Sequence, residues 1–174
     1  KPLFPFGSGL GYTDFETEIL RADEKSVAVS VQNTGRYPGK ETVQLYISAP
    51  QGTLGQPPRK LAAFAKTKEL APGEHQELTV SYDLRNISSY DEKASAYVLE
   101  AGDYTVLAGS IPAVTVRLNE IIVLKQTRSA FGSPDFEDWR PEHTASEVAA
   151  DNTIQISAGS FERETVEYDI ETAV

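Results

Sequence analysis

Short runs of alternating apolar and polar side chains fill the first two-thirds of the chain, and this period of two constrains the fold more than any other feature. The run KSVAVSVQN places Val27, Val29 and Val31 on one face and small or polar residues on the other, as a half-buried β-strand requires. The run ETVQLYISA repeats the pattern over residues 42–48. Clusters of Gly, Pro and Asn separate the runs, and this composition is typical of an all-β sandwich.

Turn signals predict how the runs connect. The segment NTGRYPGKE predicts that residues 26–33 and 42–48 pair as antiparallel neighbours. Pro72-Gly73 suits the centre of a type II turn. SAYVLE and DYTVLAGS flank Ala101-Gly102-Asp103, which has the composition of a tight hairpin. With DFETEIL and HQELTVSYD, about seven strands can be counted, which predicts an immunoglobulin-like (fibronectin type III-like) sandwich.

Changes in composition divide the chain into three segments. Residues 14–111 carry the alternating runs, and no amphipathic helix interrupts residues 14–110, which excludes a parallel α/β sheet. Residues 1–13 are rich in aromatic, Pro and Gly residues, and we expect them to be a linker from a preceding domain, with Lys1 as a cut end. Residues 112–174 are expected to form a long extended arm that needs a surface to lie on.

The charge of the chain excludes several classes of partner. Sixteen Lys and Arg against 26 Asp and Glu give a net charge of -10, which repels nucleic acid and anionic membrane surfaces. No apolar run is long enough to span a bilayer. The absence of Cys excludes a disulfide framework and a thiolate metal site, and it leaves the compartment open.

Motifs for catalysis or metal binding are weak. Asp138 in FEDWR lies in a polar stretch without the strand ends of a barrel, so we do not expect it to be catalytic. His75 and His143 are far apart in sequence, which disfavours a metal site. There is no Gly-x-Ser-x-Gly elbow. We therefore expect no catalytic residue, metal or cofactor in this chain.

Five sequence blocks together resemble a known family: PLFPFGSGLGYTDF, ETVQLYISAP, LAAFAKTKELAPGE, ISSYDE and LEAGDYTVLAGS. Their order and spacing over residues 2–110 are similar to the fibronectin type III-like domain of glycoside hydrolase family 3, the β-glucosidase and β-xylosidase family. The resemblance implies a TIM barrel and an α/β sandwich elsewhere in the enzyme, which carry the nucleophilic Asp and the acid/base Glu. It also admits a permuted order in which residues 112–174 lead towards a barrel.

The resemblance implies a non-catalytic structural role, in which the sandwich braces the catalytic barrel and the α/β sandwich for hydrolysis of terminal β-D-glucosyl residues. Phe4, Phe6 and Tyr12 are the candidates for interdomain docking. This domain would contact the β-glucoside substrate only indirectly. Three aromatic residues are candidates for positions near the sugar: Tyr37, Tyr46 and Tyr90. Packing is the simpler role for those tyrosines. Two alternatives remain: a free-standing carbohydrate-binding or adhesion module, and an enzyme in its own right.

Overall fold

The computed structural model describes residues 3, 9, 11–128 and 150–165. These residues form β-strands and two short 3-10 turns, with no α-helix among them, which confirms the all-β prediction. The strands are β1 (Phe15–Ala22), β2 (Ser26–Asn33), β3 (Thr42–Ser48), β4 (Lys60–Lys66), β5 (His75–Ser81), β6 (Ser89–Asp91), β7 (Ala96–Leu99), β8 (Gly102–Ala108), β9 (Ile111–Leu118), β10 (Ile122–Gln126), β11 (Thr153–Ile156) and β12 (Glu164–Thr165), and the 3-10 turns are η1 (Leu84–Ile87) and η2 (Ala158–Ser160).

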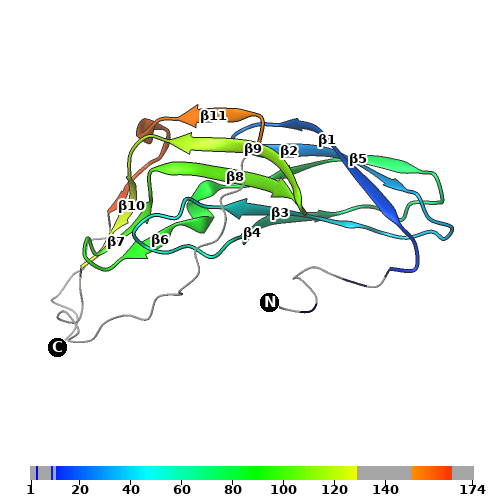
Figure 1. The fold of residues 1–174 in the computed structure, drawn as a ribbon, viewed down its shortest axis with the longest axis horizontal. Helices are drawn as coiled ribbons and strands as arrows, with labels where there is room; N and C mark the ends of the chain where they lie inside the picture. Colours follow the sequence, from blue (N-terminus) through cyan, green and yellow to red (C-terminus); the bar gives the residue numbers. More distant parts are fainter. Residues whose placement is uncertain (1–2, 4–8, 10, 129–149, 166–174) are drawn as a thin grey trace.

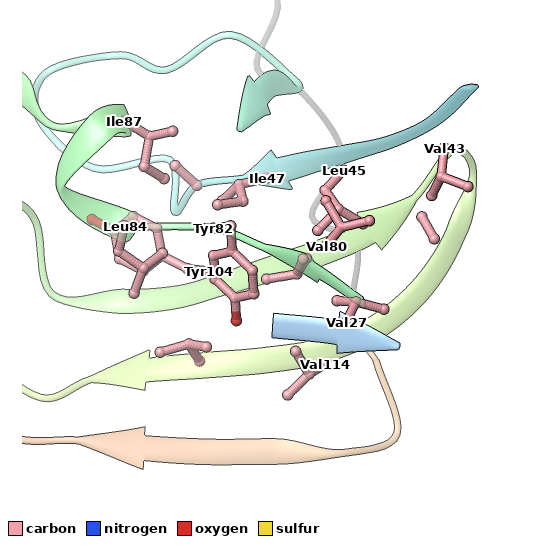
Figure 2. Packing of buried hydrophobic residues seen from close by; sticks show 14 of the residues in the cluster. Val27, Val43, Leu45, Ile47, Val80, Tyr82, Leu84, Ile87, Tyr104 and Val114 are labelled. Atoms are coloured by element: carbon pink, nitrogen blue, oxygen red, sulfur yellow. The ribbon is translucent and has the colours of Figure 1, made fainter. Parts of the chain in front are cut away.

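Two sheets pack face to face and enclose the core. One has the strand order β1-β2-β5 and the other β11-β9-β8-β3-β4. Figure 2 shows Val27 and Val80 from the first sheet and Leu45 and Val114 from the second in one apolar cluster. These side chains are buried as the alternating runs predict, and burial of each is worth roughly 1.5–3 kcal/mol.

The predicted pairing of residues 26–33 with 42–48 is wrong. β2 pairs with β1 and β5, whereas β3 pairs with β4 and β8 in the opposite sheet. The connection between β2 and β3 therefore crosses from one sheet to the other, and Gly39 in it forms an isolated bridge with Leu70. Alternation of side chains identifies which face of a strand is buried. It does not show to which sheet the strand belongs, because both sheets bury one face against the same core.

The predicted hairpin at Ala101-Gly102-Asp103 is also wrong. β7 belongs to a small sheet of order β12-β10-β7-β6, whereas β8 lies in the five-stranded sheet. The Tyr104 hydroxyl donates a hydrogen bond to the Glu100 carbonyl at 2.9 Å, in the manner of the tyrosine corner of immunoglobulin-like sandwiches. The Glu100 carboxylate accepts from the Thr53 amide at 2.7 Å and so holds the β3–β4 connection on this corner.

The predicted turn at Pro72-Gly73 is confirmed. Gly73 has a φ of 80°, and the Glu74 N–H donates to the Ala71 carbonyl at 2.9 Å. This is the geometry of a type II turn, in which the third residue needs a positive φ.

The sandwich continues past residue 111, where an extended arm was expected to begin. β9 buries Val114, Val116 and Leu118 in the core, and β10 adds Ile122. Without β11, the two sheets of the sandwich contain seven strands, and β9 is one of them. β7, which the sequence counted among the seven, lies instead in the small sheet. The alternation of apolar residues in IPAVTVRL favours a strand as strongly as the earlier runs do.

A segment of residues 150–165, here called the strap, joins two sheets (Figure 1). Its β11 pairs in parallel with β9, and its β12 pairs in parallel with β10. Ile154, Ile156 and Phe161 pack against the core from this side. The strap therefore covers the β9 edge of the five-stranded sheet, which would otherwise present unpaired backbone groups.

We expect Ile154→Ala to lower the free energy of unfolding by about 1.5 kcal/mol, roughly half the cost for a fully buried isoleucine. Urea denaturation of the 174-residue chain measures the effect. The matched control is Gln155→Ala, because Gln155 is exposed on the same strand and its loss should change stability by less than about 0.5 kcal/mol. Equal midpoints for the two variants would show that the strap adds nothing to the fold.

Candidate interdomain docking site

The segment before β1 exposes apolar side chains where it enters the sandwich. Tyr12 is 95% exposed, and Leu3 is exposed as well. Phe4 and Phe6, the other two docking candidates, lie outside the described residues. Large apolar side chains that are exposed to this extent are expected on a surface that another part of a protein covers.

The side chain of Asn33 holds this entry point in place. It is fully buried at the end of β2. Its Oδ1 accepts from the Thr13 hydroxyl at 2.8 Å and from the Gly35 N–H at 3.0 Å. Its Nδ2 donates to the carbonyls of Tyr37 and Leu70, each at 2.8 Å. Both donors and both lone pairs of the amide are therefore used.

This hydrogen bonding ties three separate parts of the chain together: the entry segment, the β2–β3 connection and the β4–β5 connection. Close approach of the backbone makes it possible, because a Cβ on Gly35 would lie 2.1 Å from the Thr13 hydroxyl oxygen. Sequence analysis did not identify Asn33 as a functional residue. Its position in the strand could have identified it, because Asn33 places a polar side chain on the inward face after Val27, Val29 and Val31.

Tyr37 belongs to the same end of the molecule as the entry segment. Its ring is 64% exposed, and its carbonyl is bound to Asn33. Tyr12 precedes Thr13, which is bound to the same amide. One docking candidate and one sugar-proximal candidate thus extend from segments fixed by a single side chain.

Glu41 contributes a half-buried charge at this end. Its N–H donates to the Thr67 hydroxyl at 2.9 Å, and its carbonyl accepts from the Thr67 N–H at 2.9 Å. Burial raises the pKa of the Glu41 carboxyl above its ordinary value of 4.5, while the Thr42 N–H and the charge of Lys66 act in the opposite direction. The desolvated carboxylate therefore opposes folding once it is ionised.

The other two sugar-proximal candidates lie elsewhere. Tyr46 is half-buried on β3, and its hydroxyl donates to Gln44 Oε1. Tyr90 lies on β6, at the opposite end of the molecule from the β2–β3 connection (Figure 1). Its ring contacts that of Tyr97 with centroids 5.2 Å apart and planes tilted by 60°. The structure does not gather the three candidates into one flat aromatic surface.

A cleft of about 1040 Å³ separates the strap from the corner between β5 and η1. Tyr82, Asp83 and Phe161 line it. Asp83 binds the Arg85 guanidinium at 2.6 Å, and these hydrogen bonds lower the pKa of the Asp83 carboxyl. A glycosidase acid requires a raised pKa, so Asp83 is poorly suited to that role.

The metal candidates of the sequence lie apart in the structure or outside its described residues. His75 lies exposed on β5, and there is no group of three His, Cys, Asp or Glu side chains that could hold a metal ion in residues 11–128 and 150–165. The same residues contain no helix with the length and hydropathy to cross a bilayer. Asp138 and His143 lie outside the described residues.

We expect Asn33→Ala to lower the free energy of unfolding by about 3 kcal/mol, because it removes the four hydrogen bonds of a buried amide. Gln32→Ala is the control, since the exposed Gln32 amide donates one hydrogen bond to the Gly73 carbonyl at 3.2 Å. Its effect should stay below about 1 kcal/mol. Urea denaturation distinguishes the two, and equal losses would contradict the role assigned to Asn33.

A pH titration of stability tests the environment of Glu41. Because the pKa of the Glu41 carboxyl is raised in the folded state, its contribution to stability is complete below pH 4.5. This contribution is lost as the pH rises through the pKa of the folded state. Glu41→Gln lacks this loss, so its stability relative to wild type should increase from pH 4 to pH 7. Denaturation midpoints of both proteins across this range measure the difference. A difference independent of pH would show that Glu41 is not desolvated.

Comparisons with known proteins agree with the fold. Residues 41–111 match the profile of the fibronectin type III-like domain. Beta-glucosidase A of Butyrivibrio fibrisolvens is 32% identical over 98% of this chain and 25% of its own length. A β-glucosidase of Ruminococcus albus is 48% identical over 62% of this chain and 12% of its own length.

Solved structures give the same result. A β-glucosidase from Paenibacillus barengoltzii superposes with a TM-score of 0.65 and 37% identity, over 84% of this chain and 19% of that protein. β-Glucosidase 3B from Thermotoga neapolitana superposes with a TM-score of 0.56 and 34% identity, over 66% of this chain and 17% of that protein. This chain thus spans a quarter or less of each of these relatives. Residues 41–111 thus form a fibronectin type III-like domain, and the chain is similar to a region of the β-glucosidases of glycoside hydrolase family 3.

Proposed function

We propose that this domain braces the catalytic domains of a family 3 β-glucosidase for hydrolysis of terminal β-D-glucosyl residues, without supplying a catalytic residue of its own. The observation that carries the proposal is the exposed entry segment fixed by Asn33. The short share of each relative that this chain spans supports the presence of other domains in the same enzyme. The proposed partners are the catalytic barrel and the α/β sandwich.

The bracing is mechanical. Tyr12, together with Phe4 and Phe6, would bury its ring against the preceding domain, and the Thr13–Asn33 hydrogen bond would keep that segment from pivoting on the sandwich. A second exposed ring, Tyr37, extends from the same support. Such a joint limits movement of the catalytic groups, and a displacement of about 1 Å can reduce a rate on the order of a hundredfold.

The alternative of a free-standing carbohydrate-binding module has less support. Sugar rings stack on exposed aromatic faces, and a row of rings has to lie in one plane to follow an extended chain of sugars. The aromatic pair on the small sheet, Tyr90 and Tyr97, is tilted by 60°. In addition, the Tyr90 hydroxyl is within 3.1 Å of the Thr127 hydroxyl, so part of its polar edge is already engaged.

An activity assay tests the proposal. We expect the 174-residue chain alone to leave an aryl β-glucoside intact, and the remaining enzyme to gain activity when this chain is supplied. Tyr12→Ala should reduce that gain at least tenfold, because Tyr12 is a docking candidate whose side chain the structure shows exposed. Tyr97→Ala is the control and should leave the gain unchanged.

Hydrolysis by the chain alone would overturn the proposal and favour an enzyme. Binding of a β-glucan by the chain alone, with no effect on the remaining enzyme, would overturn it in favour of a binding module.

A further inference from the structure

The outer surface of β4 carries a second group of exposed apolar side chains that the proposed bracing role does not use. Phe64 is 69% exposed and Leu61 is 41% exposed. Both lie in LAAFAKTKELAPGE, one of the blocks that distinguish this chain as a sequence. β4 is an edge strand, because it ends the order β11-β9-β8-β3-β4.

A β-bulge directs both side chains outward. In a regular strand, residues three positions apart point to opposite faces. Here Leu61 lies opposite Tyr46 and Ala63 lies opposite Leu45, so Ala62 is an extra residue in β4. The bulge shifts the alternation by one residue. Phe64, opposite Gln44, therefore shares the outward face with Leu61.

The neighbouring strand β3 extends the apolar surface through Tyr46, which lies opposite Leu61 on β4. On its other side Tyr46 lies opposite Leu107 of β8, which is fully buried, so the exposed apolar surface ends at Tyr46. The Tyr46 hydroxyl donates to Gln44 Oε1, which fixes the ring along its own strand. Tyr46, Leu61 and Phe64 form what we call the β3–β4 patch.

The ends of β4 show which part of the strand is available for docking. Lys60 turns inward, where its Nζ donates to the Ile87 carbonyl at 3.1 Å and burial lowers its pKa. Lys66 stands at the other end, opposite Thr42. Lysines at the ends of an edge strand discourage addition of another strand along the backbone. The side-chain face of β4 is thus a better docking surface than its backbone edge.

We infer that the β3–β4 patch docks another domain of the polypeptide that contains this chain. The inference rests on the proposed function, and it adds a second surface to the entry segment. At least three-quarters of each compared relative lies outside the region that this chain spans, so a partner in the same polypeptide is available. The end of β4 is also tied to the Asn33 end, because Thr67 is bonded to Glu41 and the Leu70 carbonyl accepts from the Asn33 amide.

The chemistry of the patch fits a protein surface better than a sugar. Sugars need hydrogen-bonding groups around an aromatic face. In the patch, Leu61 and Phe64 are purely apolar, and the Tyr46 hydroxyl already donates to Gln44. The partner surface should therefore be apolar, with an acidic group placed to meet the exposed Lys66 at the rim.

Hydroxyl-radical footprinting with mass spectrometry tests the inference on unaltered protein. We expect Phe64 to be oxidised at least fivefold more slowly in the natural polypeptide than in the 174-residue chain. Ile121, 61% exposed in the connection between β9 and β10, is the reference side chain and should react equally in both. Equal Phe64 rates in the two proteins would overturn the inference.

Two other occupants are tested with the isolated chain. Slower oxidation of Phe64 at rising protein concentration, with a doubled mass in light scattering, would assign the patch to a second copy. Slower oxidation on addition of cello-oligosaccharides would assign it to a sugar. Either result would overturn docking of a domain.

A pair of variants separates docking from folding. Phe64→Ser in the natural polypeptide should raise the oxidation rate of Tyr46 at least threefold, whereas Ile121→Ser should not. In the isolated chain both variants should keep the wild-type denaturation midpoint, because both side chains are exposed. If catalysis needs this domain but Phe64 is oxidised equally fast in the natural polypeptide and in the isolated chain, only the inference about the β3–β4 patch fails. If this domain has no effect on catalysis, the proposed function itself fails.

Discussion

A single buried amide, that of Asn33, determines how the chain enters the sandwich. Its four hydrogen bonds reach the entry segment and the β2–β3 and β4–β5 connections. An amide in an apolar interior is tolerated only when its donors and acceptors are all paired. The three segments must therefore come together in one arrangement, because any other leaves polar groups without partners.

The rest of the structure follows from closing the two sheets around one core. β9 completes the larger sheet, and the strap adds β11 to its edge while β12 joins the small sheet. At the corner between β7 and β8, the Tyr104 hydroxyl and the Glu100 carboxylate bind backbone groups on separate segments. Buried polar groups thus fix the connections, and the apolar side chains provide most of the stabilisation.

The supporting role that we propose rests on the placement of exposed aromatic residues. Tyr12 and Tyr37 extend from the end held by Asn33, and Phe64 stands on the outer face of β4. In contrast, the acidic side chain of Asp83 in the cleft beside the strap is paired with Arg85. A rigid sandwich with apolar rings on its surface positions other domains well, since it loses little conformational freedom when they dock.

The sequence by itself determined the strand class and the buried faces, because alternation is a local property: Val27, Val29 and Val31 are buried as the pattern predicts. It also marked Tyr12 as a candidate for interdomain docking, and the structure shows this residue exposed. Only the tertiary structure decided that β2 and β3 lie in opposite sheets, that residues 150–165 complete the sandwich, and that Asn33 joins three segments. Those features depend on contacts between residues far apart in the chain, and a local pattern carries no information about which distant strand or carbonyl will be the partner.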